Sequence, residues 1–201
     1  MKSIKLSFAA LALAVSLPSL AQVGLRLGNP SFNGTGCPIG SVATALSPDD
    51  TQLSILFDQF VVEAGPAAGT NLARKNCSIA IPVTVPNGYS VSVVGVDYRG
   101  FVGLPRGRAT ATFTASYFFA DARGVSFSKT YRGGENTNYV LENDLLLTAV
   151  TWSRCGAQTN LRISSSMMVN NPEMRQDALA TVDSVDVSSG IVYQLQYRSC
   201  R

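Results

Sequence analysis

The sequence predicts an all-β fold, a β-sandwich of the jelly-roll or immunoglobulin type that is stabilised by disulfides and contains very little helix. Three observations support this prediction. Apolar and polar residues alternate along much of the chain, as they do in half-buried strands. Glycine, proline and asparagine separate the alternating segments where strands must reverse. The cysteines all follow a segment typical of an export leader, which is the usual context of structural disulfides.

Residues 1–21 have the pattern of a secretory signal peptide. Lysines precede the apolar stretch Leu6–Leu17, and small residues lie just before Gln22. The apolar stretch is shorter than the roughly 20 residues that cross a bilayer. We therefore expect residues 1–21 to be cleaved off. Residues 22–201 should form a single secreted β-sandwich domain with no membrane anchor, in the periplasm or outside the cell.

The predicted strands follow one another at short intervals. In the first of them, Leu53, Ile55 and Phe57 alternate with Ser54 and its neighbours. Further strands are expected over Ile79–Val85, Tyr89–Val96, Thr110–Ala115, Asn160–Val169 and Ile191–Tyr197. Turns are expected at Pro86-Asn87-Gly88 and Arg132-Gly133-Gly134.

Two local signals refine this pattern. Pro82 has no N–H for a strand ladder, so its strand should lie at a sheet edge or contain a bulge. Asn171-Pro172-Glu173 resembles a helix start, with asparagine as the cap and proline in the first turn. We expect a short helix there, and we expect Trp152 to pack in the core.

The cysteines are Cys37, Cys77, Cys155 and Cys200. They contain no C-x-x-C pair, so the sequence favours disulfides over a metal site. Because strands that follow each other in sequence tend to be neighbours, we expect Cys37 to pair with Cys77 and Cys155 with Cys200. The other pairings remain open, since loop entropy separates them by only about 1 kcal/mol.

The chain contains no histidine, with 16 Lys and Arg against 13 Asp and Glu and a net charge of +3. The commonest general base and metal ligand is therefore missing, and no cofactor is expected. A charge this close to neutral does not indicate a nucleic-acid partner. The oligomeric state stays open.

Several short motifs resemble a secreted four-cysteine family of unknown function known from fungi and bacteria. They are Cys37-Pro38-Ile39-Gly40-Ser41, Arg74-Lys75-Asn76-Cys77, Asp97-Tyr98-Arg99-Gly100-Phe101, Thr151-Trp152-Ser153-Arg154-Cys155-Gly156 and a terminal cysteine. Tyr197 stands where tryptophan would be expected. The resemblance covers nearly all of the mature chain. It implies a secreted β-rich domain and brings no activity, cofactor or catalytic residue.

The segment from Tyr98 to Arg108 is the predicted contact surface. Its glycines and Pro105 interrupt the strand pattern, so we expect a loop and not a central strand. The candidate binding residues are Tyr98, Arg99, Phe101, Arg106 and Arg108, which offer rings for stacking and guanidinium groups for forked hydrogen bonds.

Other aromatic residues follow this loop. We expect most of them to pack in the core of the sandwich, and the alternative is that they form an exposed sugar-binding face. Phe118 and Phe119 are adjacent, so on a strand they must face opposite sides. Glu142 and Asp144 would share a face if their segment is extended. They are candidates for calcium binding or for glycoside hydrolysis, and solvated surface is the alternative.

These observations favour a non-catalytic secreted protein that binds glycan or another component of the envelope or extracellular surface. The first alternative is a glycoside hydrolase or lyase that uses carboxylates and tyrosine. The second is a structural coat or matrix protein that associates with copies of itself.

Overall fold

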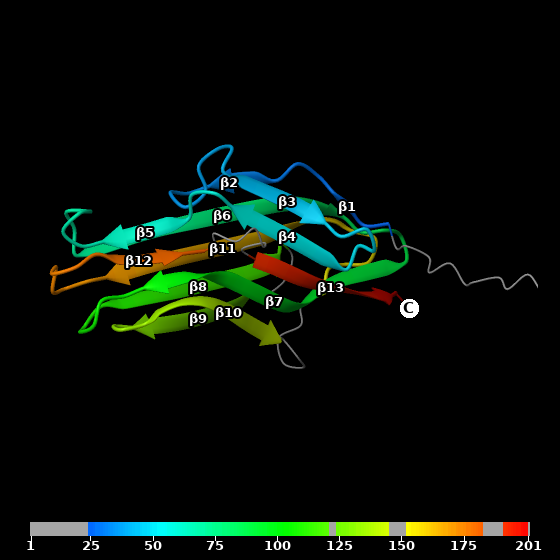
Figure 1. The fold of residues 1–201 in the computed structure, drawn as a ribbon. Coiled ribbons are helices and arrows are strands. Elements are labelled where there is room, and N and C mark those ends of the chain that lie inside the picture. Colours follow the sequence, from blue (N-terminus) through cyan, green and yellow to red (C-terminus); the bar gives the residue numbers. More distant parts are fainter. Residues whose placement is uncertain (1–23, 121–123, 145–151, 183–190, 201) are drawn as a thin grey trace, which may run out of the picture.

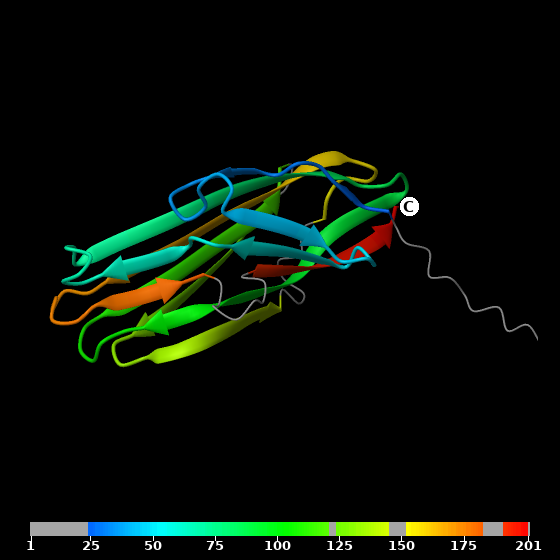
Figure 2. The same cartoon turned by 45° about the horizontal axis from the view of Figure 1, so that its top comes forward.

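The computed structural model describes residues 24–120, 124–144, 152–182 and 191–200, so the predicted leader lies outside it. Within these residues the chain forms thirteen strands and no helix. The strands make two antiparallel sheets that pack face to face (Figures 1 and 2). The predicted all-β sandwich is confirmed. No helix among the described residues is long and apolar enough to cross a membrane.

The first sheet, sheet A, has the strand order β1-β6-β11-β8-β9, with β2 also pairing with β6. Its strands are β1 (Arg26–Leu27), β2 (Ser31–Asn33), β6 (Leu72–Thr84), β8 (Thr110–Phe119), β9 (Val125–Arg132) and β11 (Gln158–Asn170).

The second sheet, sheet B, has the strand order β3-β4-β13-β7-β12-β5, with β10 also pairing with β7. Its strands are β3 (Val42–Leu46), β4 (Gln52–Phe57), β5 (Val61–Ala64), β7 (Tyr89–Gly103), β10 (Asn136–Asp144), β12 (Ala178–Thr181) and β13 (Ile191–Ser199).

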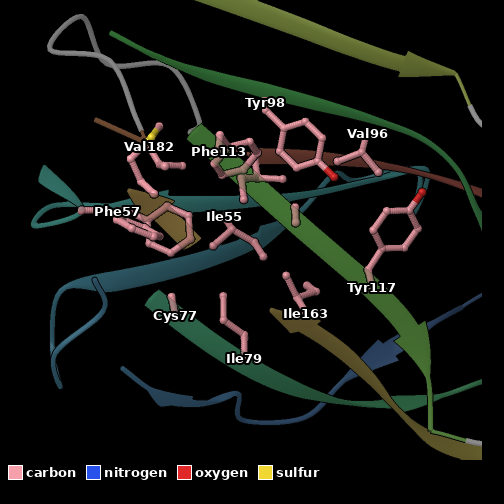
Figure 3. Packing of buried hydrophobic residues seen from close by; sticks show 14 of the residues in the cluster. Ile55, Phe57, Cys77, Ile79, Val96, Tyr98, Phe113, Tyr117, Ile163 and Val182 are labelled. Atoms are coloured by element: carbon pink, nitrogen blue, oxygen red, sulfur yellow. The ribbon is translucent and has the colours of Figure 1, made fainter. Parts of the chain in front are cut away.

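The core lies between the sheets and follows the predicted alternation. On β8, Ala111, Phe113 and Ala115 are buried while the threonines between them are only partly so. Leu53, Ile55 and Phe57 of β4 are buried in the same way. Figure 3 shows Ile55 and Phe57 facing Cys77 and Ile79 of β6 across the interface. Period-two patterning thus identified the inward faces of β4 and β8.

One strand departs from half-burial, because Ser90 and Ser92 of β7 are buried as well as the valines. The segment around Ser153 covers their outer side. The Ser90 hydroxyl donates to the Ser153 carbonyl, and the Val91 N–H donates to the Ser153 hydroxyl at 3.1 Å. Trp152, expected in the core, instead lies half-buried on this covering segment.

The expected helix after Asn171 is absent, and the segment forms turns. The Asn171 amide nitrogen donates to the carbonyls of Ala64 at 3.0 Å and Gln176 at 2.7 Å, so this side chain closes a loop and does not cap a helix. Pro82 lies on β6, which is not an edge strand. The Pro82 carbonyl accepts a hydrogen bond from the Gly28 N–H, beside the short edge strand β1. Because the N–H and C=O of a residue in an antiparallel strand point to the same side, the N–H that Pro82 lacks would point toward this edge and not toward β11.

Both expected disulfides are present, Cys37–Cys77 and Cys155–Cys200. The first is buried and joins the loop before β3 to β6. The second joins the covering segment of Trp152 to the end of β13, and Cys155 is exposed. The topological argument for sequential pairing is confirmed.

Candidate functional site

The residues of the predicted contact surface do not lie on one loop. Residues up to Gly103 belong to β7, which pairs with β10 on one side and with β13 and β12 on the other. The prediction of a loop is therefore wrong for residues 98–103, whereas residues 104–108 do lie on the loop between β7 and β8. Tyr98 is fully buried in the core, where its ring stacks on Phe127 at 5.4 Å between centroids.

The four remaining candidates of that surface separate into two places. Arg99 and Phe101 are half-buried on the outer face of sheet B, at alternate positions to Tyr98. Arg106 and Arg108 are exposed on the loop between β7 and β8, at one end of the sandwich. The structure therefore brings Arg106 and Arg108 together and separates them from Tyr98.

Glu142 lies on the edge strand β10 opposite Asp97 and is exposed. Asp144 pairs with Gly95 through the backbone, and its side chain lies outside what the structure describes. Among the described residues, no three His, Cys, Asp or Glu side chains gather as a group that could hold a metal ion.

A polar concavity lies on the outer face of sheet A, on strands that the sequence analysis did not connect. It has a volume of about 710 Å³ and is open to solvent. Its lining residues are Arg74, Asn76, Thr114, Ala115, Ser116, Ser126, Phe127, Ser128, Ser164, Ser165 and Ser166. Most of these side chains carry a hydroxyl, an amide or a guanidinium group.

Strand register explains this concentration of hydroxyls. Antiparallel pairing aligns outward residues of β6, β11, β8 and β9 in rows across the sheet. The rows are Ser78-Ser164-Ser116-Ser126, Asn76-Ser166-Thr114-Ser128 and Arg74-Met168-Thr112-Thr130. We call this set of residues the hydroxyl face.

Hydrogen bonds hold parts of this face in place. The Arg74 Nε donates to the Ser166 hydroxyl at 2.8 Å, and the hydroxyls of Thr112 and Thr130 lie 3.0 Å apart. Both contacts join directly paired strands, β6 with β11 and β8 with β9. The hydroxyl face is therefore carried by regular strands and not by loops.

A second concavity of about 320 Å³ continues the first and shares Ser164 with it. It adds Phe118 of β8 and Arg162 of β11, which are directly paired. Phe119 is buried while Phe118 faces outward, as expected for adjacent strand residues. The hydroxyl face therefore ends at a half-buried ring and an exposed guanidinium group.

The other tyrosines of the aromatic cluster belong mainly to the core. Tyr117, Tyr131 and Tyr139 are buried. The hydroxyls of Tyr98, Tyr117 and Tyr193 have no hydrogen-bond partner among the described residues. Burial disfavours the phenolate, so it raises the pKa of each well above the usual value. These residues are therefore part of the packing and not of an exposed sugar-binding face.

Sequence reasoning missed the hydroxyl face although its signal was present. Thr110, Thr112 and Thr114 of β8 alternate with buried residues, and the exposed Ser126 and Ser128 of β9 lie on either side of the half-buried Phe127. Within any one strand, these outward hydroxyls look the same as the polar residues of an ordinary solvated face. Only the register between strands far apart in sequence shows that the hydroxyls form one surface.

Comparison with known proteins gives three findings. Residues 24–200 match the model of DUF4360, a domain of unknown function. A protein of Arthroderma benhamiae, described as an uncharacterized secreted protein, is 33% identical over 170 residues, which cover 85% of this chain and 69% of that protein. The solved structure of TmCBM61 in complex with beta-1,4-galactotriose is 9% identical and covers 85% of this chain and 88% of that chain, with a TM-score of 0.28.

The similarity to TmCBM61 is too slight to bear on function. The secreted relative and the two disulfides indicate an exported protein. With a match over nearly the whole length, the chain belongs to the DUF4360 family, the secreted four-cysteine family that its motifs resemble.

Proposed function

We propose that this protein binds glycan through the hydroxyl face of sheet A, in the periplasm or outside the cell. The observation that carries the proposal is the alignment of serine, threonine and asparagine side chains from four strands over one open concavity. Neutral sugars offer hydroxyls that both donate and accept hydrogen bonds. Serine and threonine hydroxyls do the same, so the two surfaces are chemically matched.

The spacing of the hydroxyl face suits a ligand with repeated groups. Neighbouring strands lie about 4.8 Å apart, and alternate residues along a strand lie about 6.7 Å apart. Outward side chains therefore form a regular two-dimensional array of hydrogen-bond partners. Because strands hold the array, little conformational entropy is lost on binding.

Phe118 and Arg162 make one end of this array chemically different from the rest. A phenyl ring stacks against the apolar face of a sugar, and a guanidinium group forms forked hydrogen bonds to oxygens. Both side chains line the end of the joined concavities. A sugar unit stacked on Phe118 would leave the next units over Ser164 and Ser116.

The test is a binding screen of the secreted protein against soluble neutral and acidic polysaccharides, with hydrolysis products followed in parallel. Thr114→Val with Ser164→Ala removes two hydroxyls from the centre of the face. We expect about tenfold weaker binding, since each hydrogen bond contributes about 0.5–1.5 kcal/mol. Phe118→Ala should weaken binding by a similar factor.

Thr84→Val is the matched control. Thr84 is exposed on β6 and lies outside both concavities, so its hydroxyl should not matter. Equal binding by the parent and the Thr114 and Ser164 variant would reject the hydroxyl face as the site. Release of sugar products would favour the hydrolase or lyase alternative.

A further inference from the structure

A pocket of about 320 Å³ lies at one end of the sandwich, between the β7–β8 loop and the β11–β12 loop. Its lining residues are Pro105, Arg106, Arg108, Ala109, Asn171, Glu173, Arg175 and Gln176. We call it the arginine pocket. Two of its arginines are among the binding candidates that the sequence indicated, whereas Arg175 and Glu173 were not.

Both walls of the arginine pocket are fixed by the fold. On the β11–β12 side, Asn171 is 1% exposed and holds the carbonyls of Ala64 and Gln176. On the β7–β8 side, the Gly134 N–H donates to the carbonyls of Leu104 at 3.1 Å and Pro105 at 3.2 Å. The pocket therefore exists before any ligand arrives, which reduces the entropy lost on binding.

The charges in the pocket do not balance. Three arginines face one carboxylate among its described lining residues. The Glu173 carboxylate is engaged with Arg108, whose Nε lies 3.6 Å from Oε1 and whose backbone N–H donates to the same atom at 3.2 Å. Neither Arg106 nor Arg175 has a hydrogen bond or ion pair with another described residue. An excess of positive charge thus remains available.

The arginine pocket adjoins the hydroxyl face. Thr110 pairs with Asn170 in the last outward row of sheet A, next to Arg132 of β9. Arg108 lies two residues before Thr110, on the loop that leads into β8. β8 and β11 therefore run from the Phe118 end of the hydroxyl face to the two loops that line the arginine pocket.

We propose that the arginine pocket binds the carboxylate of an acidic sugar unit, at the opposite end of β8 and β11 from Phe118. That the carboxylate belongs to a glycan rests on the proposed function. The anion site itself stands on the pocket's charge and geometry. Guanidinium groups bind carboxylates through paired hydrogen bonds, and two of the three are unengaged. Glu173 competes with the ligand for the arginines, so it lowers the affinity of the pocket for the carboxylate of the sugar.

The experiment compares three probes on the secreted protein: trigalacturonate, its neutral counterpart galactotriose, and free galacturonate. Arg106→Ala with Arg175→Ala should weaken trigalacturonate binding at least tenfold and flatten its dependence on salt, because exposed charges are screened. Galactotriose binding should not change. Glu173→Gln keeps an acceptor for the Arg108 N–H and removes the competing charge, so it should raise trigalacturonate affinity about threefold.

Arg26→Ala is the control for net charge, since Arg26 is exposed on β1 outside the pocket. It should leave trigalacturonate affinity within twofold of the parent. Unchanged trigalacturonate binding in the Arg106 and Arg175 variant would overturn the anion site. If galactotriose does not bind and trigalacturonate binds no more tightly than free galacturonate, with both acids dependent on the two arginines, the glycan proposal fails and the anion site stands.

Discussion

Tyr117 of β8 and Tyr193 of β13 pack edge to face across the interface between the two sheets, with ring centroids 5.6 Å apart and ring planes at 73°. Their rings fill the core, but their hydroxyls have no hydrogen-bond partner among the described residues. The contact therefore combines favourable ring packing with an unfavourable desolvation of polar groups.

This combination predicts that Tyr193→Phe is harmless or stabilising. The substitution keeps the ring and removes the desolvated hydroxyl, so the free energy of unfolding should stay unchanged or rise by about 1 kcal/mol. Tyr139→Phe is the matched comparison, because the Tyr139 hydroxyl donates to the Thr181 carbonyl at 2.7 Å. Its loss should cost about 1 kcal/mol. Urea unfolding of both variants checks this, and a larger loss in the Tyr193 variant than in the Tyr139 variant would contradict it.

The buried tyrosines also predict instability in alkali. Burial raises the pKa of Tyr98, Tyr117, Tyr131, Tyr193 and Tyr197 above 10. The folded state then holds protons that the unfolded state loses from about pH 10 upward. Stability should be constant with respect to these groups below pH 9 and should fall as the pH rises through 10 and beyond.

Absorbance at 295 nm and circular dichroism followed together between pH 8 and pH 12.5 check this. We expect most tyrosinate absorbance to appear with the loss of β structure. Titration of all tyrosines near pH 10 in a protein that stays folded would show that the rings are accessible.

The two disulfides should differ in their resistance to reductants. Cys37 and Cys77 are 1% and 0% exposed, whereas Cys155 is at the surface. A thiolate must reach a sulfur atom to exchange, so mild reductant should open Cys155–Cys200 first. Differential alkylation with peptide mapping over time measures the order. Earlier labelling of Cys37 or Cys77 would show that the buried bond is reached through local opening.

Removal of either bond should cost about 2–5 kcal/mol. Cys155→Ser with Cys200→Ser should therefore lower the free energy of unfolding while it leaves the Cys37–Cys77 bond intact. A melting temperature equal to that of the parent would show that the C-terminal bond adds nothing to stability.

Local pattern was enough to identify the strands and their buried faces. On β4, β8 and β11 the apolar residues at every second position are the ones that face the core. This worked because side chains alternate sides along any strand, whatever its partners are. The disulfide pairing followed too, since strands close in sequence tend to be close in space.

The Tyr98–Arg108 segment shows where local reasoning failed. Gly100 looked like an interruption, yet it lies within β7 and a Cβ there would overlap the Thr181 carbonyl and the Tyr139 hydroxyl. The glycine is required by close packing. Likewise, Asn171 resembled a helix cap, but its amide donates to the carbonyl of Gln176 in its own loop and to that of Ala64, far away in the sequence. The contact with Ala64 could not be inferred from neighbouring residues.

By itself, then, the sequence determined that this is an exported, disulfide-bonded all-β protein of the family its motifs resemble, and which side of most strands is buried. The tertiary structure decided which outward residues lie together. Ser164, Ser116 and Ser126 form one row because β11, β8 and β9 pair in a particular register. Register depends on hydrogen bonds and core contacts between segments far apart in the chain, and no local pattern contains them.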